Sequence, residues 1–167
     1  MRALQRQCYA LATLRLRAAV DQAGGGAGLA ILSDIDETIL DNSAVMAAAM
    51  HNEGMFQNLD TWLLWEREGN PHLIPGAAEF FALADSLGVT IFYVSDRFEE
   101  NKLATIATLS RLGLPQVCAE QVLLFGPPKA RAARRLKAAT GSSCSLATRC
   151  TISMARSPAP RWRISTA

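Results

Sequence analysis

The fold is decided by residues 28–42, which read GLAILSDIDETILDN. The first part is an apolar run that is too short for a helix and follows a glycine cluster, so it predicts a buried parallel strand. The run ends at two acids, Asp34 and Asp36. In open α/β sheets, ligands bind beyond the carboxyl ends of the strands, so acids at this point indicate a chemical site. Burying two acids together is costly unless a cation or a shared proton offsets their charge.

Length and composition are those of one globular domain. The chain has 167 residues, half of them hydrophobic, which is enough to bury a sizeable core. The formal net charge of +2 hides an asymmetry, because all fifteen acids lie at or before Glu120 while nine of the seventeen bases follow it. A basic end of this kind is common in proteins that bind nucleic acids or membranes. We attribute it instead to an aberrant tail, described below, and expect no nucleic-acid partner.

Cysteine spacing and apolar runs exclude several classes of protein. The four cysteines show neither CxxC nor Cys/His ligand spacing, so a zinc site is not expected. No apolar run approaches the ~20 residues of a membrane span, so no transmembrane segment is expected. Near the start, Gln5, Arg6 and Gln7 interrupt any apolar region of a signal peptide, so this sequence carries no export signal. A cytoplasmic protein and a missing upstream segment both stay open.

Periodicity predicts the remaining elements. Residues 3–20 place five residues at helical spacing, which predicts that this face packs on the domain: Leu4, Cys8, Leu11, Leu14 and Ala18. Further helices are expected over residues 43–50, 61–68, 76–87 and 99–112, and buried strands over residues 89–95 and 121–125. Asp60 is the expected N-cap of the helix over 61–68, Gly69 is its expected end, and Pro75 opens the next helix.

The order of these elements predicts the fold class. Strand, helices, strand, helix, strand is the order of an α/β protein with a parallel sheet, right-handed crossovers and flanking helices. Residues 43–75 are long for a single crossover, and we expect them to form a small helical cap over the carboxyl ends of the strands. The predicted domain covers residues 1–141, and residues 142–167, which lack strand or helix periodicity, are expected to form a poorly ordered tail.

Polar side chains follow each of the three predicted strands: Asp34 and Asp36, then Ser95, then Lys129. A carboxylate can attack phosphorus and form an acyl phosphate, while a second acid protonates the leaving oxygen and later deprotonates water. A serine and a lysine can stabilise the phosphoryl oxygens. Magnesium, a hard ion that prefers oxygen ligands, relieves the repulsion between carboxylates and phosphate. This combination of groups favours phosphoryl transfer.

Residues 34–42, DIDETILDN, resemble the first motif of the haloacid dehalogenase (HAD) superfamily. More narrowly, they are similar to the class C acid phosphatases, the lipoprotein-e type of 5′-nucleotidase. WLLW at residues 62–65, IPGAAEF at residues 74–80 and IFYVSDR at residues 91–97 match the same pattern, so the resemblance covers residues 4–135. It implies a Rossmann-like, HAD-type parallel sheet with a small helical cap. It also implies magnesium-dependent hydrolysis of phosphomonoesters, including nucleotides, by a periplasmic, secreted or outer-membrane lipoprotein.

The resemblance assigns roles residue by residue. Asp34 would be the nucleophile and Asp36 the general acid and base. Magnesium would bind the Asp34 carboxylate and the Asp36 backbone carbonyl. Ser95 would bind the phosphoryl group together with Lys129, for which Arg131 is the substitute. The resemblance leaves the oligomeric state and the physiological substrate open.

Two features depart from the family pattern. Asp96 stands where the family usually has asparagine, and Lys129 lies in an unusual Gly-Pro-Pro-Lys context. The fourth motif, an acidic sequence that completes the metal site, is absent because no acid follows Glu120. Residues 143–157, read from their third codon bases with suitable synonymous codons, can encode VLAGDTLHDFDGAF, which fits that motif. We hypothesise that the last ~25 residues are a frameshifted tail, because they lack the local consistency of a natural sequence.

Each assignment has an alternative that stays open. A DxD pair also occurs in metal-binding glycosyltransferases, Ser95 alone could cap the next turn, and Lys129 could be a solvated loop residue. Phe56, Trp62 and Trp65 are either the core of the cap or an aromatic surface that binds substrate. The alternative function is a truncated, catalytically impaired family member that only binds phosphate or metal.

Overall fold

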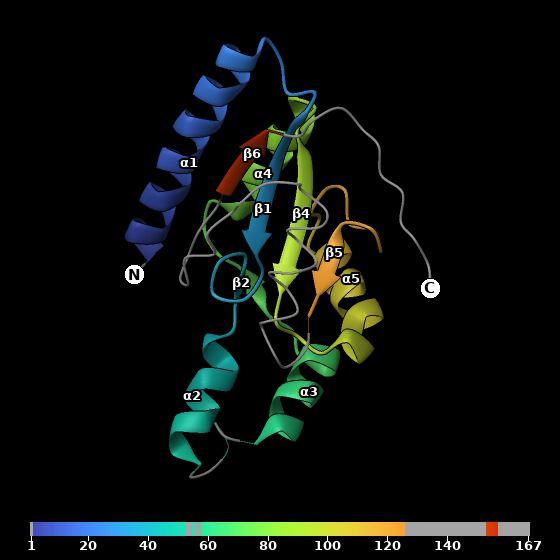
Figure 1. The fold of residues 1–167 in the computed structure, drawn as a ribbon. Helices are drawn as coiled ribbons and strands as arrows, with labels where there is room; N and C mark the ends of the chain where they lie inside the picture. Colours follow the sequence, from blue (N-terminus) through green and yellow to red (C-terminus); the bar gives the residue numbers. More distant parts are fainter. Residues whose placement is uncertain (1, 53–54, 56–57, 126–152, 157–167) are drawn as a thin grey trace, which may run out of the picture.

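The computed structural model describes residues 2–52, 55, 58–125 and 153–156 (Figure 1). Its helices are α1 (Arg2–Ala23), α2 (Ser43–His51), α3 (Leu59–Glu68), α4 (Ala77–Ser86), the 3₁₀ helix η1 (Glu99–Asn101) and α5 (Lys102–Arg111). Its strands are β1 (Leu29–Asp34), β2 (Leu40–Asp41), β3 (His72–Leu73), β4 (Thr90–Ser95), β5 (Val122–Leu124) and β6 (Ser153–Arg156). Each predicted helix and strand is present within a few residues of its expected bounds.

The central sheet confirms the predicted α/β architecture. Its strand order is β5-β4-β1-β6, and β1, β4 and β5 are parallel. Asp34 pairs with Val94, and Ser95 pairs with Leu124, so the carboxyl ends of the three parallel strands lie at one edge. In Figure 1, α2 and α3 lie beyond this edge, on the side toward which the arrows of β1, β4 and β5 point. The helices expected to form the cap therefore lie beside the predicted site.

Two features of the sheets are absent from the sequence prediction. Strand β6 pairs antiparallel with β1, with Leu32 opposite Ser153, in a region where we expected no strand. Strands β2 and β3 form a separate antiparallel pair, and Ile74 N donates to Ile39 O at 2.8 Å beside it. Two-residue strands are too short to produce a period in the sequence. The boundary at residue 142 stays a prediction, because most of the predicted tail lies outside the described residues.

The face of α1 that packs on the domain is not the predicted one. Tyr9, Leu16 and Val20 are buried. The five residues predicted to be buried are exposed: Leu4, Cys8, Leu11, Leu14 and Ala18. Tyr9 decides the orientation, because its ring lies 5.6 Å from that of Phe80 and its hydroxyl donates to Thr38 O at 2.7 Å. One large aromatic residue with a buried hydrogen bond outweighs the more regular leucine spacing.

Two helix starts also differ from the prediction. Asn58, not Asp60, is the N-cap of α3, because its side chain accepts a hydrogen bond from Asp60 N at 2.9 Å. Helix α4 begins at Ala77, and its N-cap is Gly76 at φ +99°. A Cβ atom at Gly76 would lie 2.8 Å from the Cβ of Tyr9, so the close approach of α1 to α4 requires a glycine here.

Candidate active site

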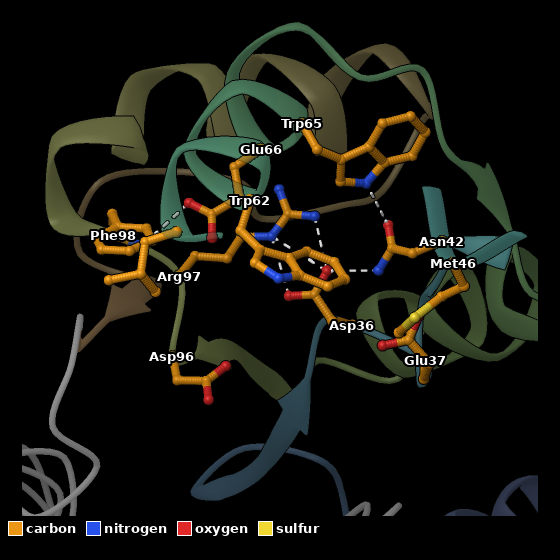
Figure 2. Close-up of a pocket in the computed structure, with 11 residues that line it drawn as sticks. Asp36, Glu37, Asn42, Met46, Trp62, Trp65, Glu66, Asp96, Arg97 and Phe98 are labelled. Carbon is orange, nitrogen blue, oxygen red and sulfur yellow. Dashed lines mark hydrogen bonds and ion pairs between the residues drawn. The ribbon is translucent and has the colours of Figure 1, made fainter. Parts of the chain in front are cut away.

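A pocket of about 390 Å³ lies where the cap meets the carboxyl ends of β1 and β4 (Figure 2). Four segments form its wall: the turn after β1, helix α2, helix α3 and the loop after β4. The lining residues that matter below are Asp36, Asn42, Trp62, Trp65, Glu66 and Arg97. A concave space with a few converging polar groups beside a sheet edge is typical of a small-molecule site.

The turn after β1 holds Asp36 in a fixed place. Ile35 and Ile39 are fully buried on either side of it, and Ile39 N donates to Ile35 O at 2.8 Å. Between them, Glu37 adopts a left-handed backbone with φ +56°, which is uncommon for residues other than glycine. The buried isoleucines anchor this closed turn to the core. The backbone on both sides of Asp36 therefore fixes the position from which its carboxylate enters the pocket.

The Asp36 carboxylate is the centre of a polar cluster, and Figure 2 shows it beside Arg97 and Asn42. Arg97 forms a two-point ion pair with it, Nη2 to Oδ1 at 2.7 Å and Nε to Oδ2 at 3.0 Å. Ser95 Oγ donates to Oδ2 at 2.9 Å, and Asn42 Nδ2 donates to Oδ1 at 2.8 Å. The Arg97 side chain is only 3% exposed. Such a buried pair is tolerated only where further hydrogen bonds satisfy its partners, and here they do.

The surroundings of Asp36 set its protonation state. Burial alone would raise the pKa of this carboxyl group. The hydrogen bonds and positive charge of Arg97, assisted by hydrogen bonds from Asn42 and Ser95, outweigh burial and hold that pKa below its ordinary value. Asp36 in this arrangement is an ionised carboxylate, which can accept a proton. It can donate one only after a proton has been supplied to it.

Asp34 and Ser95 lie at the same sheet edge but in different surroundings. The Asp34 side chain is exposed, and its Oδ2 accepts a hydrogen bond from Thr38 Oγ1 at 3.5 Å. Ser95 is 3% exposed and contacts Asp36 directly. The structure thus brings Ser95 and Asp36 together, while Asp34 lies two residues earlier, at the end of β1.

Helix α3 of the cap is attached to both loops of the site. Trp65 Nε1 donates to Asn42 Oδ1 at 2.9 Å, on the side of the turn after β1. The next residue, Glu66, accepts hydrogen bonds at Oε2 from Phe98 N at 3.1 Å and Asn101 Nδ2 at 3.0 Å, on the side of β4. Burial raises the pKa of the Glu66 carboxyl group, and these two hydrogen bonds oppose that rise only in part.

The sequence matches the family model described as HAD superfamily, subfamily IIIB (Acid phosphatase), over residues 2–143. The chain belongs to this family. It is similar to the structure of the class C acid phosphatase from Bacillus anthracis, with 35% identity and a TM-score of 0.70 over 84% of this chain and 58% of that chain. A second structure, that phosphatase with tungstate bound, gives 34% identity and a TM-score of 0.72 over 84% of this chain and 59% of that one. The chain thus spans less than two thirds of the length of these relatives.

Membership of the HAD acid phosphatases implies a divalent metal, and the donor atoms fit one in kind. The Asp34 carboxylate and the Asp36 backbone carbonyl are hard oxygen donors, as such cations prefer. The Asp36 carboxylate itself is engaged by Arg97. Within residues 2–52, 55, 58–125 and 153–156, no three His, Cys, Asp or Glu side chains are grouped so that they could hold a metal ion.

The remaining predicted site residues divide into two groups. Trp62 and Trp65 are half-buried and line the pocket, so they belong both to the cap and to the wall of the candidate site. Phe56, Lys129 and Arg131 lie outside the described residues, and their roles stay predictions.

Sequence reasoning assigned no role to three residues that hold this candidate site together. Arg97 follows Ser95 by two residues, and a base at the carboxyl end of a strand beside two acids was a usable signal. Asn42 ends the first motif, so its presence was visible but its partners were not. Glu66 carried no signal, because an acid in an amphipathic helix is usually on a solvated face.

Proposed function

We propose that this chain is a phosphomonoester hydrolase that acts through an aspartyl-phosphate intermediate. The observation that carries the proposal is the hydrogen bond of 2.9 Å between Ser95 Oγ, at the end of β4, and Asp36 Oδ2, in the turn that follows β1. An acid, a hydroxyl and a second acid at one sheet edge are the groups that phosphoryl transfer to a carboxylate uses. The family and the pocket beside Asp36 support the same reading.

The proposed reaction has two displacements. An Asp34 carboxylate oxygen attacks phosphorus, the bond from phosphorus to the ester oxygen breaks, and the leaving oxygen takes a proton from Asp36. Water then attacks phosphorus, Asp36 takes a proton from that water, and the bond to Asp34 breaks to release inorganic phosphate. Ser95 and Lys129 are proposed to hold the phosphoryl oxygens throughout. Asp36 thus ends each cycle with the proton it needs for the next one.

Asp36 can serve as the first proton donor only if the Arg97 ion pair weakens when substrate binds. A phosphate ester brings negative charge close to Arg97, and a guanidinium binds phosphate oxygens as readily as it binds a carboxylate. Competition for Arg97 would let the pKa of Asp36 rise toward its ordinary value. The ion pair in the substrate-free protein and a protonated Asp36 in the complex are therefore compatible.

We infer that the metal is Mg²⁺, held by the Asp34 carboxylate and the Asp36 backbone carbonyl. Mg²⁺ usually keeps several waters and uses one or two carboxylates together with substrate phosphate, which suits a site with few protein ligands. When bound, it supplies positive charge that offsets the repulsion between Asp34 and the phosphate.

We propose that the aromatic wall formed by Trp62 and Trp65 receives the leaving group, which would favour nucleotides and other esters with a flat ring. The 5′-nucleotidase activity suggested by the sequence resemblance is part of this proposal, as is a periplasmic, secreted or outer-membrane lipoprotein location. No helix among the described residues is both long enough and apolar enough to cross a membrane.

A second candidate function is a catalytically impaired protein that only binds phosphate or metal. It is favoured by one observation, the absence of any acid after Glu120, which leaves no carboxylate for a fourth motif. Sequencing the gene tests the frameshift hypothesis behind it. The codons of Thr148 to Ser153 must encode the acidic motif in the shifted frame, and any other codons rule out the hypothesis.

The two functions are separated by phosphate release from a chromogenic phosphate ester, measured with and without Mg²⁺. Hydrolysis that depends on Mg²⁺ and is abolished in Asp34→Asn supports the phosphatase. The matched control is Asp85→Asn, a change of the same chemistry at an exposed acid on α4, which should leave the rate unchanged. No release above the Asp34→Asn background leaves only the binding protein.

A further inference from the structure

Asn42 is the N-cap of α2, yet its side chain serves other partners. Asparagine at an N-cap usually accepts a hydrogen bond from the first turn of its own helix. The Asn42 side chain makes no such bond, and Asp41 Oδ1 instead accepts from Ser43 N at 2.9 Å. Asn42 is only 3% exposed, so its amide needs partners inside the protein.

Two partners determine the orientation of the Asn42 amide. Trp65 Nε1 donates to its Oδ1 at 2.9 Å, and its Nδ2 donates to Asp36 Oδ1 at 2.8 Å. Figure 2 shows the amide between the indole and the carboxylate. An indole N–H can only donate and an ionised carboxylate can only accept, so the residue between them must offer an acceptor and a donor. Asparagine meets this requirement, whereas aspartate of the same size does not.

Trp65 connects these hydrogen bonds with the pocket. Its side chain lines the pocket, so a molecule inside the pocket contacts the ring that donates to Asn42. The adjacent Glu66 fixes the same helix to Phe98 and Asn101 on the other side of the cluster. A displacement of α3 would therefore move hydrogen-bond partners on both sides of Asp36: Asn42 on one side, and Phe98 and Asn101 on the other.

Asn42 and Arg97 hold the same oxygen of Asp36. Oδ1 accepts from Arg97 Nη2 at 2.7 Å and from Asn42 Nδ2 at 2.8 Å. Without Asn42, this oxygen would keep only the guanidinium, and the carboxylate would be free to turn further toward Arg97. Glu37 is another carboxyl group near Asn42: burial raises its pKa, and Asn42 opposes that rise.

We propose that Asn42 is a positioning residue that couples helix α3 of the cap to the orientation of the Asp36 carboxylate. A molecule that contacts Trp65 in the pocket then changes, through the Asn42 amide, the orientation of the Asp36 carboxylate, which is the proposed proton donor and acceptor. The catalytic consequence rests on the phosphatase function proposed above. The coupling itself does not, because it is a property of the hydrogen bonds in the folded protein.

The coupling is tested without substrate in proton–nitrogen correlation spectra of the full chain. The indole N–H signal of Trp65 is assigned by its loss in Trp65→Phe. Ser95→Ala removes one donor from Asp36 on the β4 side and should shift the Trp65 signal. In an Asn42→Ala background, the same Ser95→Ala change should leave the signal in place. A shift that is absent with Asn42 present, or equal in both backgrounds, overturns the proposal. If Asn42→Ala does not fold, Asn42→Ser replaces it, because serine is a favourable N-cap residue but is too short to bridge the two partners.

The catalytic consequence is tested by kcat and KM for an aryl phosphate and for methyl phosphate. Asn42→Ala should lower kcat about tenfold to a hundredfold with both esters, the cost of a lost hydrogen bond to a charged group. Trp65→Phe removes the donor that orients Asn42 and should lower kcat with both esters. The loss should be larger for the aryl ester, because only the aryl group is large enough to contact the pocket wall. The matched control is Asn58→Ala, which removes the exposed N-cap of α3 itself. An equal loss in Asn58→Ala would mean that any loosening of the cap suffices and would contradict the role of Asn42.

No phosphate release by the unaltered chain refutes only the phosphatase function, and the spectra still decide the coupling.

Discussion

The Tyr9 cluster and the Asp36 cluster both join segments that are far apart in the sequence. Tyr9 and its ring neighbours join α1, α4 and β4 mainly by aromatic contacts, with Phe81 and Tyr93 5.6 Å apart. The hydroxyl groups of Tyr9 and Tyr93 each donate to a backbone carbonyl oxygen. The Asp36 cluster joins the turn after β1, the cap and the loop after β4 by hydrogen bonds and one ion pair. Ring contacts tolerate small shifts, whereas a two-point ion pair requires one geometry. The Tyr9 cluster therefore mainly stabilises the fold, and the Asp36 cluster mainly fixes the positions of the side chains in the candidate site.

The largest expected effect is a loss of stability when a buried apolar residue of α1 is truncated. Leu16→Ala on α1 should lower the free energy of unfolding by roughly 2–5 kcal/mol, because Leu16 is fully buried and its loss leaves a cavity. Leu11→Ala is the matched control on the same helix, and its effect should stay within about 0.5 kcal/mol because Leu11 is 51% exposed. Urea unfolding monitored by circular dichroism measures both. Equal losses in the two variants would mean that Leu11, on the face predicted from the sequence, also packs on the domain.

Removal of Arg97 should have the next largest effect. Arg97→Ala leaves the Asp36 carboxylate without its counter-charge and should destabilise the fold by roughly 3 kcal/mol. This is the lower end of the range for buried pairs, because the Asp36 side chain is 24% exposed. The control is the double change Asp36→Leu with Arg97→Met, which should regain most of the loss. A double variant as unstable as Arg97→Ala would show that the cost is packing, not uncompensated charge.

Low pH should lower the free energy of unfolding by less than Arg97→Ala does, because protonation neutralises Asp36 instead of leaving its charge unpaired. The pKa of Asp36 in the folded protein is lower than its ordinary value. Its contribution to stability is therefore complete above that ordinary value and is lost as the pH falls from there through the lower pKa of the folded protein. The free energy of unfolding should therefore fall below about pH 4. The decline should be shallower in Arg97→Ala, and an unchanged slope would contradict the ion pair. Glu66 changes the stability in the opposite direction, because burial raises its pKa and its protonation at low pH favours the folded state. The same pH series in Glu66→Gln removes this contribution from the measured slope.

The smallest expected effect concerns the hydrogen bond from the Tyr9 hydroxyl to Thr38 O. Tyr9→Phe keeps the ring and removes the donor to Thr38 O, so it should cost about 1 kcal/mol. Thermal unfolding of the variant measures it, with Tyr93→Phe as a second hydroxyl deletion at a residue whose hydroxyl donates to Pro115 O. A Tyr9→Phe loss well above that of Tyr93→Phe would mean that the hydroxyl positions the turn after β1 as well as satisfying a carbonyl.

The sequence predicted those features that depend on local pattern. The apolar run before Asp34, the glycine and proline boundaries of the helices, and the length of the segment before Pro75 were sufficient for the strands, the fold class and the cap. They also placed Asp36 and Ser95 at one edge, because parallel strands end on the same side. Local pattern failed for α1, where leucine spacing favoured a face that the structure leaves exposed.

Contacts between distant segments could not be predicted in the same way. Arg97 and Asp36 are 61 positions apart, and Asn42 and Trp65 are 23 apart. Their meeting depends on how α3 packs against both loops, which no single window of sequence records. Arg97 could have been singled out from its position after Ser95, but its partner could not have been chosen among several nearby acids.

The attachment of α3 through two consecutive residues has an evolutionary consequence. Each residue of an α-helix turns the chain by about 100°, so one residue inserted or deleted between Asn58 and Trp65 would rotate Trp65 and Glu66 away from both partners at once. Substitutions on the outer face, such as at Leu64, which is 49% exposed, change neither attachment. Related chains should therefore vary in the composition of this helix but not in the number of residues from its N-cap to the tryptophan.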